Sequence, residues 1–89
     1  MLKVDFTNEF KKQTKLMKKR GLDMALLDDV INLLVNNEPL PRKYRDHALI
    51  GRYAGFRECH IKPDWLLIYY SEGSELLLYR TGTHSDLFD

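Results

Sequence analysis

The chain has 89 residues, of which 44% are apolar and 30% charged, and its formal net charge is +1. This length and composition indicate one globular domain over residues 1–89 with a thin core, and they exclude a disordered chain. No apolar run approaches the ~20 residues of a membrane span, and no signal-peptide core opens the chain, so we expect a cytoplasmic protein. The single cysteine, Cys59, excludes an internal disulfide framework and suits a reducing compartment.

The first half of the chain predicts one strand and two helices. Residues 2–6 alternate apolar and polar side chains, as a short strand does. Thr7 or Asn8 can cap the helix that follows, which Gly21 ends. Asp23 is a suitable N-cap for a second helix, whose apolar residues recur at helical spacing until two prolines stop it.

Positive charge is concentrated in this first half. Residues 1–45 hold ten Lys and Arg against six Asp and Glu, whereas residues 46–89 hold four against seven. Lys11, Lys15 and Lys18 recur at helical spacing, so the first helix presents a basic stripe. Such a stripe is most often a solvated face, and a binding surface for an acidic partner is the alternative.

The second half predicts a loop followed by three strands. Residues 41–55 contain two glycines and no period of their own, so we expect a connecting loop with at most a turn of structure. Runs of strand-forming residues at 56–61, 65–70 and 75–82 are separated by short turn signals, which favours an antiparallel meander. The order β-α-α-β-β-β predicts an α+β fold with two helices on one face of a small, mainly antiparallel sheet. A three-helix protein with a β-hairpin is the alternative, but it needs a helical last third.

Alternation along the strand at 56–61 separates its reactive side chains. Glu58 and His60 share one face of the sheet, while Cys59 and Ile61 share the other. Because Cys59 and Ile61 are typical core residues, we expect a buried, unreactive thiol, with Glu58 and His60 facing away from the helices.

The last ten residues, "RTGTHSDLFD", place unusual chemistry at a chain end. Arg80 lies in the last predicted strand, and a turn at Gly82 directs His84 back toward the sheet. If this tail folds over the exposed face of the sheet, Arg80, His84 and Phe88 meet His60 there. Phe88 closing the core at the sheet edge is the structural alternative.

Two further residues can join this group. His47 precedes the three strands, and Asp64 follows Pro63 in the turn between the first two. Surface histidines and an aspartate that shapes a bend are the structural alternatives. Three His and one Asp can also bind zinc, but their spacing matches neither a Cys-pair nor an HExxH motif, so we favour chemistry without a metal or cofactor.

Two segments of the second half, residues 44–70 and 76–88, carry an ordered motif set. The pattern is DH, L-x-G, then G-x-R-E-x-H-I-x-P-D-W, a strand, R-x-G-T-H and a near-terminal Phe. It resembles the YafQ group of the RelE/ParE superfamily, the small toxins of type II toxin–antitoxin pairs. The matching residues are Asp46, His47, Leu49, Gly51, Gly55, Arg57, Glu58, His60, Pro63, Asp64, Trp65, Arg80, Gly82, Thr83, His84 and Phe88.

The resemblance implies a RelE-like fold and an endoribonuclease that cuts mRNA in the ribosomal A site. It also implies a cognate antitoxin that silences the enzyme, in a complex able to bind operator DNA. We expect an acidic antitoxin segment that folds on binding. The resemblance implies an acid–base set of His47, His60, Asp64 and His84, a phosphate clamp in Arg80 and a base-stacking ring in Phe88. Glu58 is a further candidate because it shares the strand face of His60. From the charge asymmetry we expect rRNA contacts by the basic stripe of Lys11, Lys15 and Lys18.

The residue types suit this chemistry independently of the resemblance. RNA carries its own nucleophile, the 2′-hydroxyl, so cleavage needs a base, an acid and a cation beside the phosphate. Imidazoles, with an ordinary pKa near 6.5, can serve as base and acid, and a guanidinium binds phosphate oxygens bidentately. A ParE-like gyrase poison, which has no chemical use for the histidines, and an inactive antitoxin-binding module are the alternatives.

Overall fold

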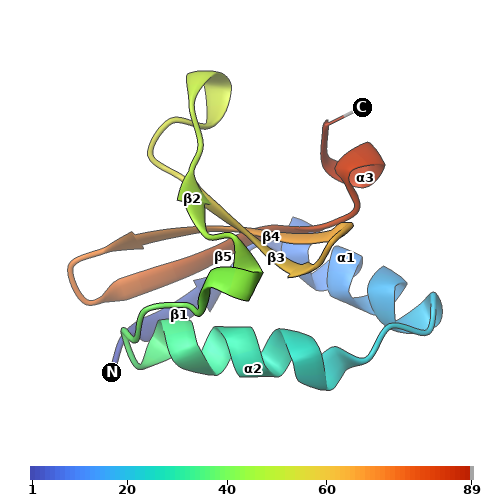
Figure 1. Cartoon of the computed structure of the whole chain (residues 1–89), viewed down its shortest axis with the longest axis horizontal. Coiled ribbons are helices and arrows are strands. Elements are labelled where there is room, and N and C mark those ends of the chain that lie inside the picture. Colours follow the sequence, from blue (N-terminus) through green and yellow to red (C-terminus); the bar gives the residue numbers. More distant parts are fainter. Residues whose placement is uncertain (89) are drawn as a thin grey trace.

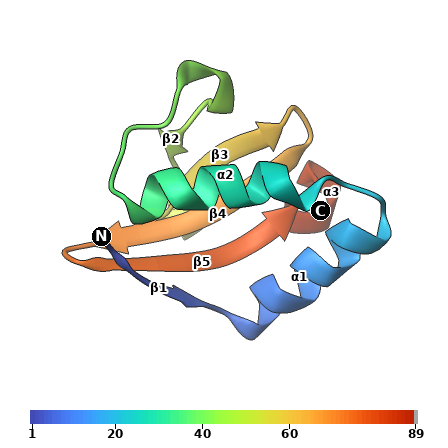
Figure 2. The ribbon, with the colours of Figure 1, turned by 90° about the horizontal axis from the view of Figure 1, so that it is seen from below.

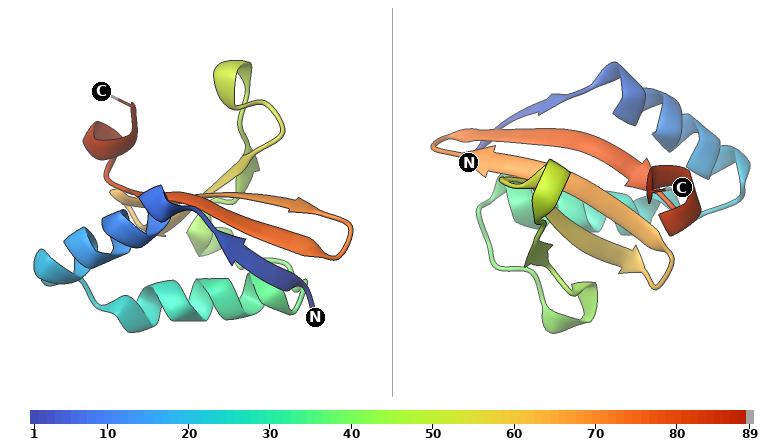
Figure 3. Two further views of the ribbon diagram at one scale, coloured as in Figure 1. Left: turned by 180° about the vertical axis from the view of Figure 1, so that it is seen from behind. Right: turned by 90° about the horizontal axis from the view of Figure 1, so that it is seen from above.

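The computed structural model describes residues 1 to 88 as one five-stranded sheet with helices on both faces (Figures 1 and 3). The predicted order of a strand, two helices and three strands is confirmed, and two short elements, β2 and α3, are added to it. No helix in this range is long and apolar enough to cross a bilayer. The elements are β1 (Lys3–Phe6), α1 (Asn8–Lys19), α2 (Met24–Val35), η1 (Arg42–Tyr44), β2 (His47–Ala48), η2 (Gly51–Tyr53), β3 (Arg57–Lys62), β4 (Trp65–Glu72), β5 (Glu75–Gly82) and α3 (His84–Phe88).

The sheet has the strand order β1-β5-β4-β3-β2. The first strand pairs in parallel with the last long one, from Lys3 opposite Glu75 to Phe6 opposite Leu78, and the other neighbours are antiparallel. Both α1 and α2 lie on one side of this sheet, and α2 runs across it (Figure 2). The predicted mainly antiparallel sheet with two helices on one face is therefore confirmed.

Both predicted helix starts are confirmed in atomic detail. The Thr7 hydroxyl accepts a hydrogen bond from the backbone N–H of Phe10 (2.9 Å), so Thr7 and not Asn8 is the N-cap. The same hydroxyl donates to the carbonyl of Tyr79 (2.7 Å), which ties the start of α1 to β5. The Asp23 carboxylate accepts from the N–H of Ala25 (3.0 Å) and caps α2.

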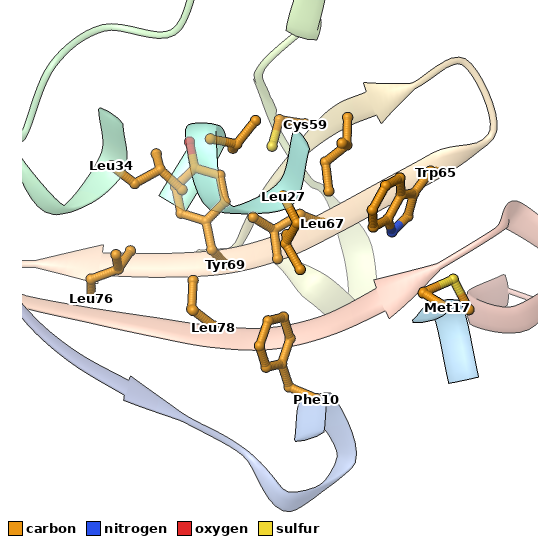
Figure 4. Packing of buried hydrophobic residues seen from close by; sticks show 12 residues of the cluster. Phe10, Met17, Leu27, Leu34, Cys59, Trp65, Leu67, Tyr69, Leu76 and Leu78 are labelled. Carbon is orange, nitrogen blue, oxygen red and sulfur yellow. The ribbon is translucent and has the colours of Figure 1, made fainter. Parts of the chain in front are cut away.

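The main core lies between the two long helices and the sheet (Figure 4). Cys59 is fully buried in this core, and burial raises the pKa of its thiol to about 12. The thiol is therefore protonated and shielded, as the strand alternation predicts. Buried members of this core are Phe10, Met17, Leu27, Val30, Leu34, Cys59, Ile61, Trp65, Leu67, Tyr69, Leu76 and Leu78.

The face of the sheet turned away from α1 and α2, here called the distal face, is less exposed than the sequence analysis expected. Leu66 and Ile68 of β4 are fully buried there beneath Leu87 of α3. The partly buried side chains of Leu49, Phe56 and Tyr79 pack around this second cluster. In Figure 1 the segment before β3 and α3 both rise on this side. The expectation of an uncovered face is wrong, because the continuous apolar run at 65–70 places apolar side chains on both faces of β4.

Candidate active site

Two adjacent rows of paired residues cross the distal face and carry four of the predicted site residues. In each row, neighbouring strands place their residues directly opposite one another. From β2 to β5 the first row is His47, Glu58, Ile68 and Arg80. From β3 to β5 the second row is His60, Leu66 and Gly82. The two-residue strand β2 thus holds His47 beside β3, where the sequence predicted a loop.

The three histidine rings form a series of neighbours, here called the histidine or imidazole line. The ring centroids of His47 and His60 are 6.1 Å apart, and those of His60 and His84 are 5.9 Å apart. His60 is therefore the middle ring, with a neighbour from the segment before it and one from the chain end. Residues 37 positions apart along the chain come to this group because β2 pairs with the first residues of β3, while His84 of α3 bonds Asp64 just after the end of β3.

Each imidazole is held through its Nδ1 atom by an oxygen that only accepts hydrogen bonds. A carbonyl or carboxylate oxygen at this distance requires the proton on Nδ1, so Nε2 is the nitrogen left to exchange a proton with a substrate. The contacts are His47 to the carbonyl of Arg45 at 2.7 Å, His60 to the carbonyl of Pro63 at 3.1 Å, and His84 to the carboxylate of Asp64 at 3.1 Å.

Glu58 lies between two of these rings. Its side chain is only 6% exposed, and its Oε1 is 3.7 Å from Nε2 of His47 and 3.5 Å from Nε2 of His60. A carboxylate this deeply buried needs charged or hydrogen-bonding partners, and the imidazoles provide them. Glu58 therefore stabilises positive charge on either ring. These three residues also offer one ligand atom each within 4.8 Å of one another, so they could hold a metal ion.

Asp64 orients the third ring. Its Oδ1 accepts hydrogen bonds from the backbone N–H of His84 (3.0 Å) and from the ring (3.1 Å). The backbone N–H of His84, and then its ring, lower the pKa of Asp64, so this carboxyl is ionised at neutral pH. The His84 side chain is 57% exposed, and its Nε2 can therefore meet a substrate from solvent.

The short helix α3 is held at its first turn by a reciprocal cap and an ion pair. The backbone N–H of Thr83 donates to the Asp86 carboxylate (2.9 Å), and the N–H of Asp86 donates to the Thr83 hydroxyl (3.1 Å). Arg20, the C-cap of α1, binds the same carboxylate bidentately at 2.7 and 3.1 Å. Gly82 permits this arrangement, since a Cβ there would lie 2.9 Å from the Cβ of Asp86.

Arg80 and Phe88 flank the imidazoles. Arg80 shares the sheet row of Glu58, and its guanidinium donates to the carbonyl of Leu87 (3.1 Å). Phe88 is 43% exposed, and its ring centroid is 6.2 Å from that of His84. The chain end therefore does fold over the sheet and places Phe88 beside a histidine.

The basic stripe is separate from the histidines. Lys11, Lys15 and Lys18 are exposed on α1, which lies on the other side of the sheet from α3 (Figure 1). The ammonium of Lys11 is 4.9 Å from the ring centroid of Phe6 on β1. The structure thus does not bring these lysines into the histidine group.

Asp46 has a structural role that sequence reasoning missed. Its carboxylate accepts hydrogen bonds from the Tyr69 hydroxyl (2.6 Å) and from Arg57 (3.3 and 3.2 Å). These contacts anchor the residue directly before His47 to β3 and β4. The DH pair in the sequence was the available signal, but it does not reveal the partners of the aspartate.

Comparison with known proteins decides the family. The model of the YafQ family, described as a bacterial toxin of type II toxin–antitoxin systems, matches residues 2–89. The chain belongs to the YafQ toxin family. The mRNA interferase toxin YafQ of Escherichia coli K12 is 43% identical over 86 residues, which cover 96% of this chain and 94% of that relative.

Solved structures of two bacterial toxins share the whole fold. The E. coli DinJ–YafQ complex contains a chain with a TM-score of 0.94 and 41% identity, covering 100% of both chains. A copper-bound mutant toxin from Helicobacter pylori also has a TM-score of 0.94, with 44% identity over 99% of this chain and 100% of that chain. The rows and the histidine line described above therefore lie on a YafQ-type fold in this chain.

We predict that the ion pair between Arg20 and Asp86 keeps α3 in place. Arg20→Met should lower the hydrogen-exchange protection of the Leu87 amide, which bonds the Thr83 carbonyl within α3. Binding of Arg20, and then the backbone N–H of Thr83, hold the pKa of Asp86 well below its ordinary value. The stabilisation is therefore present above about pH 4 and is lost as the pH falls below it. Arg20→Met should remove most of this pH dependence.

Lys19→Met is the matched control, because it removes a neighbouring charge that makes no contact with Asp86. Protection factors for Leu87 measured between pH 3 and 7 check the prediction. Equal loss of protection in both variants would show that net charge, and not the ion pair, holds α3.

Proposed function

We propose that this YafQ-family toxin is a cytoplasmic endoribonuclease that cuts mRNA on the ribosome by metal-independent acid–base catalysis. The observation that carries the proposal is the line of three imidazoles with fixed Nδ1 atoms, beside a guanidinium in the same sheet face. Its relative from E. coli is named an mRNA interferase. These features supply the groups that cleavage through the 2′-hydroxyl requires.

The reaction needs two proton transfers on opposite sides of one phosphate. A base takes the proton of the 2′-hydroxyl, whose oxygen then forms a bond to phosphorus. The bond from phosphorus to the 5′-oxygen breaks, and an acid protonates that oxygen. The products are a 2′,3′-cyclic phosphate and a 5′-hydroxyl, so atoms and charge balance without another reactant.

Two groups in the site can divide these transfers. His84 offers an exposed Nε2 and is oriented by an ionised Asp64. His47 and His60 share the buried carboxylate of Glu58, which stabilises whichever ring holds the extra proton. We assign proton exchange at the phosphate to His84 on one side and to the His47–Glu58–His60 group on the other.

Arg80 and Phe88 position the RNA in this proposal. Arg80 donates through Nη1 to the Leu87 carbonyl, and its Nη2 lies 4.0 Å from the exposed Glu9 carboxylate. In this proposal the phosphate oxygens, where charge accumulates in the transition state, displace Glu9 and bind the guanidinium. The exposed ring of Phe88 next to His84 provides a stacking surface for a base. Both residues thus act on the substrate at the side of the site formed by α3.

We infer the binding partners from the positive charge of α1 and from the complexes of related toxins. In this proposal the lysines of α1 bind rRNA while the distal face meets the mRNA. The E. coli DinJ–YafQ complex supports a cognate antitoxin for this chain too. We propose an antitoxin with an acidic segment that folds on binding, in a complex that binds operator DNA.

The first test replaces the imidazoles. His84→Ala and His60→Ala should each lower the cleavage rate about 10²- to 10⁴-fold, the usual contribution of an acid–base group, and should relieve growth arrest after induction. Primer extension maps the mRNA ends, and circular dichroism verifies folding. Tyr70→Phe, which removes a hydroxyl bonded to Glu72 at the far end of β4, serves as the control.

The outcomes separate this proposal from the alternatives. Full toxicity of both alanine variants would contradict the site assignment. DNA damage without mRNA cleavage would favour a ParE-like gyrase poison. Intact mRNA on translating ribosomes, together with tight antitoxin binding, would favour an inactive binding module.

The second test concerns the basic stripe. The triple variant Lys11→Ala, Lys15→Ala, Lys18→Ala should raise KM for programmed ribosomes and leave kcat unchanged, because it removes phosphate contacts but no reacting group. The slope of log affinity against log salt should become shallower by about two units for three lost contacts. The control variant Lys3→Ala, Lys43→Ala removes lysines outside the stripe. An unchanged KM in the triple variant would identify the stripe as a solvated face.

The third test concerns metals. Protein stripped with EDTA and desalted before it meets ribosomes should cleave at the untreated rate. Added Cu²⁺ should inhibit, because imidazole and carboxylate ligands suit this ion and His47, Glu58 and His60 would be withdrawn from proton transfer. Loss of activity on stripping, with recovery on adding a metal, would contradict metal-independent catalysis.

A further inference from the structure

An aromatic ring outside both cores meets the predicted base-stacking ring. Tyr53 of η2 lies edge-on to Phe88 of α3, with ring centroids 5.8 Å apart and an interplanar angle of 89°. The two elements rise from the distal face on either side of it (Figure 1). Two segments separated by β3, β4 and β5 in the chain thus meet through these rings.

Packing does not explain the position of Tyr53. Within residues 1 to 88 it belongs to neither buried cluster, and its hydroxyl forms no hydrogen bond. Phe56, three residues later, does pack in the distal cluster, with its ring 4.6 Å from that of Tyr79. Tyr53 is therefore a half-exposed ring whose aromatic neighbour is itself exposed.

The position of this ring pair relative to the imidazoles suggests a ligand. Phe88 is in contact range of both His84 (6.2 Å) and Tyr53 (5.8 Å). A flat group stacked on Phe88 would lie next to the most exposed imidazole, and Tyr53 would turn from its edge-on position to cover the other side of that group. An edge-to-face pair is a weak contact, and a planar base stacked on aromatic rings replaces it with larger contact area.

We propose that Tyr53 is a specificity-determining residue that, with Phe88, holds one unpaired mRNA base between two rings beside the scissile phosphate. This inference rests on the proposed ribonuclease function and names a part of its substrate site. Tyr53 contacts the base and takes no part in proton transfer. Its loss should therefore weaken substrate binding and relax the choice of cleavage position, without slowing the chemical step.

The test compares three variants on programmed ribosomes. Tyr53→Leu should raise KM about tenfold, leave kcat within about twofold and spread cleavage over more codon positions. Tyr53→Phe and Tyr53→Trp should keep the wild-type KM, because stacking needs the ring and not the hydroxyl. Tyr70→Leu is the matched control, since it removes a tyrosine ring packed on Phe56 (5.6 Å) at the far end of β4. A Tyr53→Leu variant with wild-type KM and cleavage pattern would overturn the inference and leave the ribonuclease proposal standing.

A second measurement does not depend on cleavage. Ribosomes are loaded with a series of mRNAs, each with the fluorescent base 2-aminopurine at one position of the A-site codon. A 2′-deoxy sugar at the cleavage position removes the nucleophile and prevents cleavage. Wild-type protein should quench the fluorescence at one position by stacking, and Tyr53→Leu should not. Fluorescence quenching that depends on Tyr53 would support this inference. If the same protein failed to cut mRNA that has ribose at every position, the nuclease proposal alone would be refuted. Equal quenching by wild type and Tyr53→Leu would refute the inference.

Discussion

The site depends on how a five-residue helix is fixed to a sheet. A helix as short as α3 has no stability of its own, because nucleation costs more than so few hydrogen bonds return. It persists because Leu87 is buried on Leu66 and Ile68 and because Asp86 is bound by Arg20 and Thr83. His84 and Phe88 lie on the same five residues, so the anchoring of α3 sets their positions as well.

The imidazole line shows how acceptor oxygens prepare a site for proton transfer. A free histidine can carry its proton on either nitrogen, whereas His47, His60 and His84 each have Nδ1 opposite an oxygen that cannot donate. Two of these oxygens are backbone carbonyls, so the turn geometry fixes the tautomer without adding charge. The third belongs to Asp64, which adds a negative charge next to the exposed ring. The outer rings thus differ in which nitrogen faces a carboxylate: Nδ1 of His84 faces Asp64, whereas Nε2 of His47 lies 3.7 Å from Glu58.

The long elements could be predicted from local signals alone. Thr7 and Asp23 mark the helix starts, and the alternation at 56–61 correctly separated Cys59 from Glu58 and His60. Each of these signals acts within a few residues of the feature it predicts. Propensity, capping and side-chain alternation are local properties, and they were sufficient for the element order.

The shortest elements and the contacts between distant residues could not be predicted from local signals. β2 and α3 are too short to show a period, although the Thr83 and Asp86 pair has the spacing of a capping box. The ion pair of Arg20 with Asp86 joins residues 66 positions apart, and no local pattern specifies such a partner. The buried state of Glu58 likewise follows from tertiary packing and not from its strand alternation.

The division of charge along the sequence becomes a division between faces of the molecule. The basic stripe of the first half lies on α1, while the histidines of the second half lie on the distal face of the sheet. α1 nevertheless takes part in the site, because its C-cap Arg20 holds Asp86 of α3. Gln13, also on α1, accepts a hydrogen bond from the backbone N–H of Thr81 (2.8 Å), next to Arg80 on β5. One helix therefore presents the cationic surface and fixes the chain segment that carries Arg80, His84 and Phe88, so the basic stripe and the histidine group share one support although they occupy different faces.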